Sequence, residues 1–207
     1  DAPTANAASG TTVEDQSVVI SLSGSDIDGD NLSFSLDADA SNGSVTLDGS
    51  LATYTPNTNY NGDDSFTFSV SDGEYSASAS VSLSVSAVND APTLATVLNV
   101  SFDEDGSGST SLSADDVDGD SLEFSITDGD QITASLTGSD VSFSAPADYN
   151  GSETFTITVT DGELSDSQSI TVTVNAVNDV PVANAASAET SEDQDVVISL
   201  SGSDIDG

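Results

Sequence analysis

Hydrophobic and polar residues alternate along most of the chain. In SFTFSVS (residues 65–71) and TFTITVT (residues 154–160), Phe, Ile and Val occupy every second position, and hydroxyl side chains occupy the positions between them. A period of two residues predicts β-strands with one buried and one exposed face. Shorter stretches with this pattern, such as SVVISLSG and NLSFSL, are separated by DG, NG and DGD turn signals. No apolar pattern with a helical period of useful length is present.

The chain repeats itself at an interval of 89 residues. AVNDAPT at residues 87–93 returns as AVNDVPV at residues 176–182, and the chain itself begins with DAPT. Self-similarity at a fixed interval indicates tandem domains. We therefore expect two complete repeats, residues 1–89 and 90–178, and the first part of a third, residues 179–207. About seven short strands per repeat predict an all-β fold of tandem Greek-key β-sandwiches.

The partial third repeat holds too few strands for a sandwich of its own, and an isolated hairpin is marginally stable. We expect these residues to be held by the joint before them or by pairing with a neighbouring molecule. If they packed as part of the second repeat instead, the true domain would start at a different point. The chain begins without a secretory leader pattern, so we expect it to be an internal piece of a longer protein.

The charge of the chain is entirely negative. There are 37 Asp and Glu residues and no Lys, Arg or His, which gives a net charge of −37. Phosphate binding requires Lys and Arg, so nucleic acid is excluded as a partner, and anionic membrane surfaces are disfavoured. No run approaches the roughly 18 apolar residues of a membrane span, so insertion into a membrane is not expected. Cations, or cation-rich surfaces, are the natural partners of such a chain.

Acidic residues recur at fixed places in each repeat. SDIDGD at residues 25–30 returns as DDVDGD at residues 115–120 and as SDIDG at residues 203–207. An ED pair comes before each cluster. A D/E-rich step after the tripeptide YNG, a DG turn and an ND joint follow it in each complete repeat. Hard oxygen ligands in this density suit Ca²⁺, which takes roughly six to eight of them, better than Mg²⁺.

The same motifs allow other interpretations. A polar hairpin turn, which Asp and Gly favour by themselves, is the alternative for DxDGD. An EF-hand does not fit, because Gly29 stands at loop position four instead of six and strands flank the cluster. Without His, Cys or Lys, paired-carboxylate hydrolysis is the one enzymatic chemistry left. A cluster copied into every repeat serves all repeats alike, so we expect no enzyme.

Together, the ED pair, the DxDGD cluster, the DG turn and the NDAP joint resemble the bacterial cadherin-like tandem repeats of large secreted adhesins. The resemblance covers both full repeats and the partial third. It implies an extracellular or cell-surface protein in which Ca²⁺ ions between neighbouring repeats stiffen the chain into a rod for cell adhesion. Ca²⁺-dependent binding of polysaccharide, or of another copy of the chain, is the alternative function.

The resemblance carries ligand positions over to this sequence. The first junction would use Glu14, Asp15, Asp64, Asn89, Asp90, Asp116, Asp118 and Asp161. The second junction would use Glu104, Glu153, Asn178, Asp179, Asp204 and Asp206. Asp26, Asp28 and Asp72 would form half of a site that faces a preceding repeat. Two departures leave the number of ions per junction open: Ala87 and Ala176 replace an acidic residue of the vertebrate joint, and the acid–Arg–acid motif has no Arg here.

Two further groups of residues are expected to be structural. In the YNG tripeptides, Gly62 and Gly151 are expected at positive φ, a conformation that glycine adopts without steric cost. Phe66, Phe68 and Phe155 stand at the apolar positions of the alternating pattern and are expected in the core.

Overall fold

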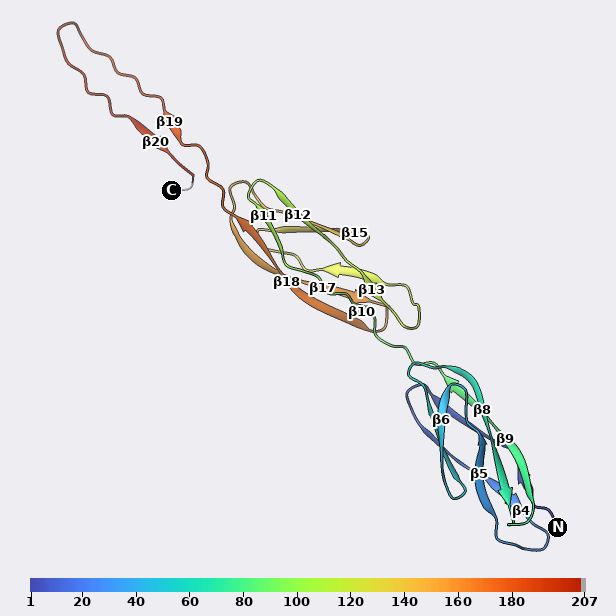
Figure 1. Ribbon diagram of the computed structural model, residues 1–207. Coiled ribbons are helices and arrows are strands. Elements are labelled where there is room, and N and C mark those ends of the chain that lie inside the picture. The colour runs from blue at the N-terminus through green and yellow to red at the C-terminus, as the bar shows by residue number, and fades with distance from the viewer. Residues whose placement is uncertain (206–207) are drawn as a thin grey trace. The chain divides into compact units, whose positions relative to one another are not determined.

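The computed structural model describes residues 1–205. The chain divides into two compact units, Asp1–Asn89 and Asp90–Gly207, and all regular secondary structure in the described part is β-strand (Figure 1). Within residues 1–205, no helix is long and apolar enough to cross a membrane. The predicted all-β fold is therefore confirmed.

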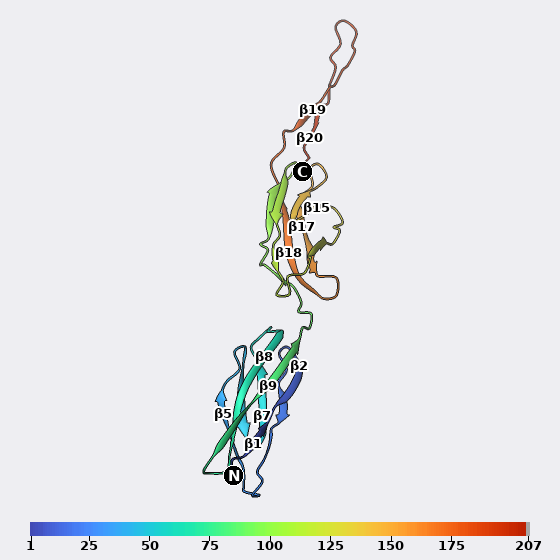
Figure 2. The ribbon, with the colours of Figure 1, turned by 90° about the vertical axis from the view of Figure 1, so that its right-hand side faces the viewer.

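The first unit is a β-sandwich. A four-stranded sheet in the order β2-β9-β8-β5 faces a three-stranded sheet in the order β3-β7-β6, and β1 pairs with β4 beside them. The strand β2 runs parallel to β9, whereas the other pairs are antiparallel (Figure 2). The strands are β1 (Thr4–Asn6), β2 (Ala8–Val13), β3 (Val18–Ser21), β4 (Ser23–Ser25), β5 (Ser33–Ala38), β6 (Gly43–Asp48), β7 (Leu51–Pro56), β8 (Gly62–Ser71) and β9 (Ser76–Ser86).

Alternation along the long strands builds the core of this unit. In β8, Phe66, Phe68 and Val70 are buried, and the hydroxyl residues between them face away from the core. Tyr54 of β7 is fully buried from the opposite sheet. Burial of each large apolar side chain contributes about 1.5–3 kcal/mol relative to leaving it in water. The prediction that the Phe residues at alternating positions form the core is confirmed.

The second unit repeats this architecture. Its sheets have the orders β11-β18-β17-β14 and β12-β16-β15, with the short pair β10-β13 beside them, and β11 runs parallel to β18. Phe143 and Phe155 meet edge to face in its core, with ring centroids 5.3 Å apart. The strands are β10 (Thr93–Leu94), β11 (Val100–Asp103), β12 (Ser107–Ser111), β13 (Ala114–Asp115), β14 (Glu123–Ile126), β15 (Thr133–Thr137), β16 (Asp140–Ser144), β17 (Gly151–Thr160), β18 (Ser165–Asn175), β19 (Val182–Asn184) and β20 (Ser201–Ser203).

The last two strands of the described chain form a separate hairpin. β19 pairs only with β20 among the described strands, in the register Val182↔Ser203, which matches Thr4↔Ser25 of β1 and β4 in the first unit. Leu22 is 4% exposed in the first unit, but its counterpart Leu200 is 83% exposed. The local hairpin therefore forms without the sheets that cover the equivalent residues in the first unit.

Candidate functional site

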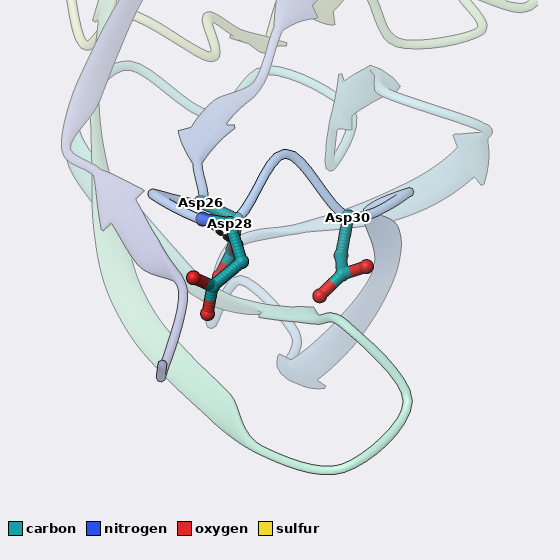
Figure 3. A group of neighbouring side chains, drawn as sticks. All are labelled: Asp26, Asp28 and Asp30. Carbon is teal, nitrogen blue, oxygen red and sulfur yellow. Dashed lines mark hydrogen bonds between the residues drawn. The ribbon is translucent and has the colours of Figure 1, made fainter.

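The first acidic cluster lies on the loop between β4 and β5. Asp26, Asp28 and Asp30 each place one carboxylate oxygen within 4.8 Å of the other two. The Asp28 N–H donates a hydrogen bond of 2.8 Å to Asp26 Oδ1, and Gly29 allows the tight turn by adopting a φ of 80°. Figure 3 shows Asp26 and Asp28 side by side, with the carboxylates of Asp28 and Asp30 on the same side of the loop.

The second unit carries the same cluster on the loop between β13 and β14. Asp116, Asp118 and Asp120 again place oxygens within 4.8 Å of one another. The Asp120 N–H donates to Asp116 Oδ1 at 3.2 Å, and the Asp90 N–H donates to Asp118 Oδ2 at 2.8 Å. Because Asp90 belongs to the ND joint, this contact places the start of the repeat beside its DxDGD cluster.

Each cluster contains a buried oxygen that lacks a protein partner. Oδ2 of Asp26 and Oδ2 of Asp116 are shielded from solvent and accept no hydrogen bond. An unsatisfied buried polar atom costs about 1–3 kcal/mol, and more when the group is charged. Buried polar groups almost always have a hydrogen-bond or ionic partner, so we expect a positively charged partner at these two oxygens. A hard divalent cation would supply it, and carboxylates are the donor set that Ca²⁺ prefers.

The first cluster carries a high density of negative charge. Asp26, Asp28 and Asp30 bring three carboxylates together, and the chain has no Lys, Arg or His side chain to offset them. Positive charge placed beside this cluster is therefore stabilised.

The DG turn between β8 and β9 adds a carboxylate near this cluster. Asp72 Oδ1 accepts the N–H groups of Glu74 and Tyr75, both at 2.7 Å, and these hydrogen bonds lower the pKa of Asp72. Asp30 and Asp72 line one cavity of about 360 Å³. In the second unit, Asp161 accepts the N–H groups of the two equivalent turn residues, at 2.6 and 2.7 Å.

The opposite end of each sandwich holds a buried glutamate. Glu14 is 4% exposed and Glu104 is 7% exposed. Oε1 of Glu14 accepts the N–H of Val88, and Oε1 of Glu104 accepts the N–H of Val177, so each carboxylate is tied to the segment that leaves its own sandwich. Oε2 of Glu14 is buried without a hydrogen-bond partner. It shares this condition with the Oδ2 atoms of Asp26 and Asp116 in the DxDGD clusters.

A third acidic group lies at the end of the second unit. Asp105, Asp148 and Asp179 place oxygens within 4.8 Å of one another. Asp105 and Asp148 occupy turns with φ values of 61° and 57°, and the Asp148 N–H donates to Asp105 Oδ1 at 3.3 Å. Asp148 and Asp179 also line a cavity of about 440 Å³ together with Asp204. The group joins two loops of the sandwich to the joint that follows it.

Four residues of these groups were not among the ligands expected from sequence: Asp30, Asp105, Asp120 and Asp148. The third Asp of DxDGD, which is Asp30 or Asp120, and the repeat equivalence of Asp105 with Asp15 are visible in the sequence and could have identified three of them. Asp148 takes the place of Asn59 in the first repeat, so its position does not look acidic there. In the first unit, Asp15 Oδ1 accepts the N–H of Asn59 at 3.2 Å, which mirrors the contact of Asp105.

Asp64 and Glu153, the acidic residues after YNG, do not join the clusters. Asp64 accepts hydrogen bonds from the backbone N–H groups of Ser41, Asn42 and Ser65 and from the Tyr54 hydroxyl, at 2.8–3.1 Å. Burial alone would raise the pKa of Asp64, but these hydrogen bonds outweigh it and lower the pKa. The oxygens of Asp64 therefore close a loop of the sandwich, and ion binding by this residue stays a prediction.

Glu153 has the same role in the second unit. Its two oxygens accept the N–H groups of Asp130, Gln131 and Ile132 at 2.7–3.3 Å. Phe143 is the counterpart of Tyr54 and has no hydroxyl to donate, so the longer Glu153 closes this loop through backbone N–H groups alone. Ion binding by Glu153 likewise stays a prediction.

The remaining expected ligands are placed as follows. Asn178 donates from Nδ2 to the Asp179 carbonyl at 2.7 Å, so its side chain braces the joint. Asn89 is the last residue of the first unit. Asp206 lies outside the described residues. Gly62 and Gly151 adopt φ values of 126° and 156°, which confirms the structural interpretation of YNG.

Comparison with known proteins places the fold. The bacterial Ig domain family matches residues 1–84 and 89–174. Among solved structures, Drosophila N-cadherin EC1-4 is similar with a TM-score of 0.59 and 19% identity, over 86% of this chain and 50% of that one. Human protocadherin-24 EC1-2 is similar with a TM-score of 0.56 and 17% identity, over 86% of this chain and 100% of that one.

A weaker likeness, with a TM-score of 0.37 and 22% identity, connects the chain to an endo-fucoidan hydrolase from glycoside hydrolase family 107. The match covers 85% of this chain but only 29% of the hydrolase. A search of curated protein sequences gave no match. The cadherin structures share the tandem β-sandwich fold, and the two family matches together span most of the sequence. This chain belongs to the bacterial Ig domain family and consists of tandem cadherin-like repeats.

Proposed function

We propose that this chain is a Ca²⁺-binding structural module of an extracellular adhesin, in which bound ions restrain the joints between successive sandwiches. The observation that carries the proposal is the set of buried carboxylate oxygens without protein partners on Asp26, Asp116 and Glu14. A chain with no Lys, Arg or His offers no side chain that could neutralise them. A divalent cation from solution would supply the missing charge.

Two kinds of ligand set would hold the ion. One is the DxDGD cluster, with Asp116, Asp118 and Asp120 in the second unit. The other is the group of Asp105, Asp148 and Asp179. In either set, the Ca²⁺ ion would offset the mutual repulsion of the carboxylates. In the second set, the three residues also bring two loops of the sandwich and the joint to one point.

Binding at the second set would restrain the joint. Glu104 already holds the joint through the Val177 N–H, and Asp179 is two residues further along the chain. Without a cation, the charges of Asp105, Asp148 and Asp179 repel and favour departure of the joint from the sandwich. With the cation, the same three residues hold the joint against the sandwich. Pro181 limits the backbone of this segment further.

The family supports a structural role in the cell envelope. Bacterial Ig domains occur mostly in surface or extracellular proteins, and Ig-like and cadherin-like repeats are as a rule not enzymes. Extracellular Ca²⁺ modules bind with a Kd of roughly 10⁻⁴ to 10⁻³ M, which matches the Ca²⁺ available outside cells. We therefore place the module outside the bacterial cell, where it would extend an adhesive protein away from the surface.

Thermal unfolding with Ca²⁺ and with EGTA tests the proposal. At a Ca²⁺ concentration ten times the Kd, one site on the native state adds about 1.4 kcal/mol to the free energy of unfolding. The variant Asp116→Asn should lose the gain that comes from the DxDGD site of the second unit, whereas Asp48→Asn, which removes an exposed charge outside the clusters, should keep the full gain. Two results together would refute the proposal: equal unfolding midpoints in Ca²⁺ and EGTA, and a distribution of molecular lengths from solution scattering that is no narrower in Ca²⁺ than in EGTA.

A further inference from the structure

Seven Asp-Gly pairs occur in the described part of the chain, and the structure separates them into reactive and protected ones. In an Asp-Gly pair, the backbone nitrogen of glycine can attack Cγ of the preceding aspartate. The glycine lacks a Cβ to obstruct this attack. Reaction requires that the nitrogen is not already donating and that the aspartate side chain can turn toward it. Hydrogen bonds and packing decide both conditions.

The pairs within the DxDGD clusters come nearest to these conditions. Their side chains are held by fewer contacts than those of the DG turns: Asp118 Oδ2 accepts one N–H, that of Asp90 at 2.8 Å, and Asp28 Oδ2 contacts the backbone nitrogen of Asp1. Asp118 and Gly119 are exposed, Gly119 has a φ of 78°, and no atom lies within 4 Å of the position that a Cβ on this glycine would take. The Gly119 N–H donates no hydrogen bond within the described residues. Asp28 and Gly29 are exposed in the same way, with a φ of 80° and the same open space.

The pairs in the DG turns are protected by the same criteria. The Gly162 N–H donates to Thr160 Oγ1 at 3.0 Å, and Asp161 Oδ1 accepts two backbone N–H groups. The Gly73 N–H donates to Ser71 Oγ at 3.1 Å, and Asp72 is held likewise. In these turns both the attacking nitrogen and the attacked side chain are tied.

Two further pairs differ from the DxDGD pairs in other ways. The Gly106 N–H donates to the Asp103 carbonyl at 3.0 Å, so the nitrogen after Asp105 is engaged. Gly129 is crowded, because an added Cβ would lie 2.3 Å from the Ile132 carbonyl oxygen. The seventh pair, Asp48-Gly49, lies at the exposed β6–β7 hairpin turn with open space around its glycine, away from both acidic clusters.

We propose that Asp118 and Asp28 are sites of isoaspartate formation that bound Ca²⁺ protects. The Gly119 nitrogen forms a bond to Cγ of Asp118, and one side-chain oxygen leaves as water with the amide proton and the carboxyl proton. Water then opens the five-membered succinimide at either carbonyl. Opening at the side-chain carbonyl restores aspartate, and opening at the main-chain carbonyl gives isoaspartate, so the net reaction adds and removes no atom.

The protection rests on the proposed function. An ion held by Asp118 fixes the carboxylate oxygens and keeps Cγ from turning toward the nitrogen. Isoaspartate lengthens the backbone by one methylene and shortens the side chain by one, so the carboxylate leaves the position it shares with Asp116 and Asp120. Modified clusters would therefore lose Ca²⁺ affinity, and loss of Ca²⁺ would become irreversible with time.

The experiment ages the full chain at 37 °C in Ca²⁺ or in EGTA and maps isoaspartate by peptide mass spectrometry with electron-transfer fragmentation. In EGTA, isoaspartate should accumulate at Asp118 and Asp28 well ahead of Asp161 and Asp72. At a free Ca²⁺ concentration ten times the Kd, the rates at Asp118 and Asp28 should fall about tenfold, because only the ion-free fraction reacts. Asp48 should react equally in both buffers.

Each contrary result has its own meaning. Modification at Asp161 as fast as at Asp118 in EGTA would overturn the assignment of reactive sites. Equal rates at Asp118 in Ca²⁺ and EGTA, while calorimetry shows Ca²⁺ binding, would overturn the protection. If calorimetry shows no Ca²⁺ binding, the proposed function fails, and the ranking of the pairs in EGTA still tests the modification sites. Asp118→Glu, which would have to form a larger ring, should abolish modification at this position.

Discussion

We predict that the change Glu14→Gln makes the first unit more stable than the natural chain in EGTA and less stable than it in Ca²⁺. One oxygen of Glu14 accepts the Val88 N–H, and the other is buried with no hydrogen-bond partner. The change Glu14→Gln keeps an oxygen for Val88 but removes the uncompensated charge. A neutral amide costs less to bury than an unpaired carboxylate. In EGTA we therefore expect Glu14→Gln to be more stable than the natural chain.

The magnitudes follow from the same contacts. An unsatisfied buried group costs about 1–3 kcal/mol. In the variant, the glutamine amide nitrogen is also buried without a partner, so only part of this cost is removed. We therefore expect the free energy of unfolding of the variant in EGTA to rise by roughly 1 kcal/mol. At ten times the Kd, Ca²⁺ stabilises the natural chain by about 1.4 kcal/mol, and the variant loses this gain at its altered site. The order of the two stabilities should then reverse.

Differential scanning calorimetry can follow the reversal, with the second unit as an internal reference. For a domain of this size, 1 kcal/mol corresponds to about 4–8 °C in the unfolding midpoint. Only the transition of the first unit should move, and the control Asp48→Asn should follow the natural chain in both buffers. A Glu14→Gln chain that is less stable in EGTA and gains as much from Ca²⁺ as the natural chain would refute the reasoning.

Three further predictions concern the sandwich itself. Tyr54→Phe should lower the free energy of unfolding of the first unit by roughly 1.5–3 kcal/mol in urea titration, because its hydroxyl donates to the charged Asp64 at 3.0 Å. Adding Asp64→Glu should restore part of the loss, since Glu153 of the second unit closes its loop without a tyrosine; no recovery would argue against this compensation. The pKa of Asp64 is lowered in the folded state, so its contribution is present above its unfolded value of 3.8 and is lost as pH falls through the folded pKa. Urea midpoints of Asp64→Asn and the natural chain should therefore converge in acid, and a constant gap would contradict this. Gly43→Ala should destabilise the first unit by roughly 1–3 kcal/mol, because the new Cβ would lie 2.4 Å from the Tyr54 ring; an unchanged midpoint would show that the ring can move away at no cost.

The sequence predicts the sandwich well because alternation has a direct physical meaning. A sheet that buries one face requires apolar residues at every second position, and Phe66, Phe68 and Val70 follow this rule throughout β8. The clusters of Asp26 with Asp28, and of Asp116 with Asp118, were also predictable, since their members are two residues apart on one loop.

The remainder of the site depends on contacts that a linear pattern does not reveal. Asp64 looked like an ion ligand because it is acidic and follows YNG, but the loop that occupies its oxygens lies 22 and 23 residues earlier. Asp148 approaches Asp105 across 43 residues, at a position where the first repeat has Asn59. In both cases the role of the carboxylate depends on which distant loop the fold brings into contact with it. Comparison of the repeats alone does not identify that loop.

The most direct test of the central claim is the electron density of the second unit in crystals grown with Ca²⁺. The account predicts a strong anomalous peak beside Asp116 and Asp118, within the roughly 2.3–2.6 Å of carboxylate oxygens that Ca²⁺ coordination requires. Oδ2 of Asp116, which has no protein partner, should be one of the oxygens that coordinate the ion. The crystals should contain Ca²⁺ at about ten times 10⁻³ M, the upper end of the expected Kd. Density beside these oxygens that fits only water under these conditions would contradict the account.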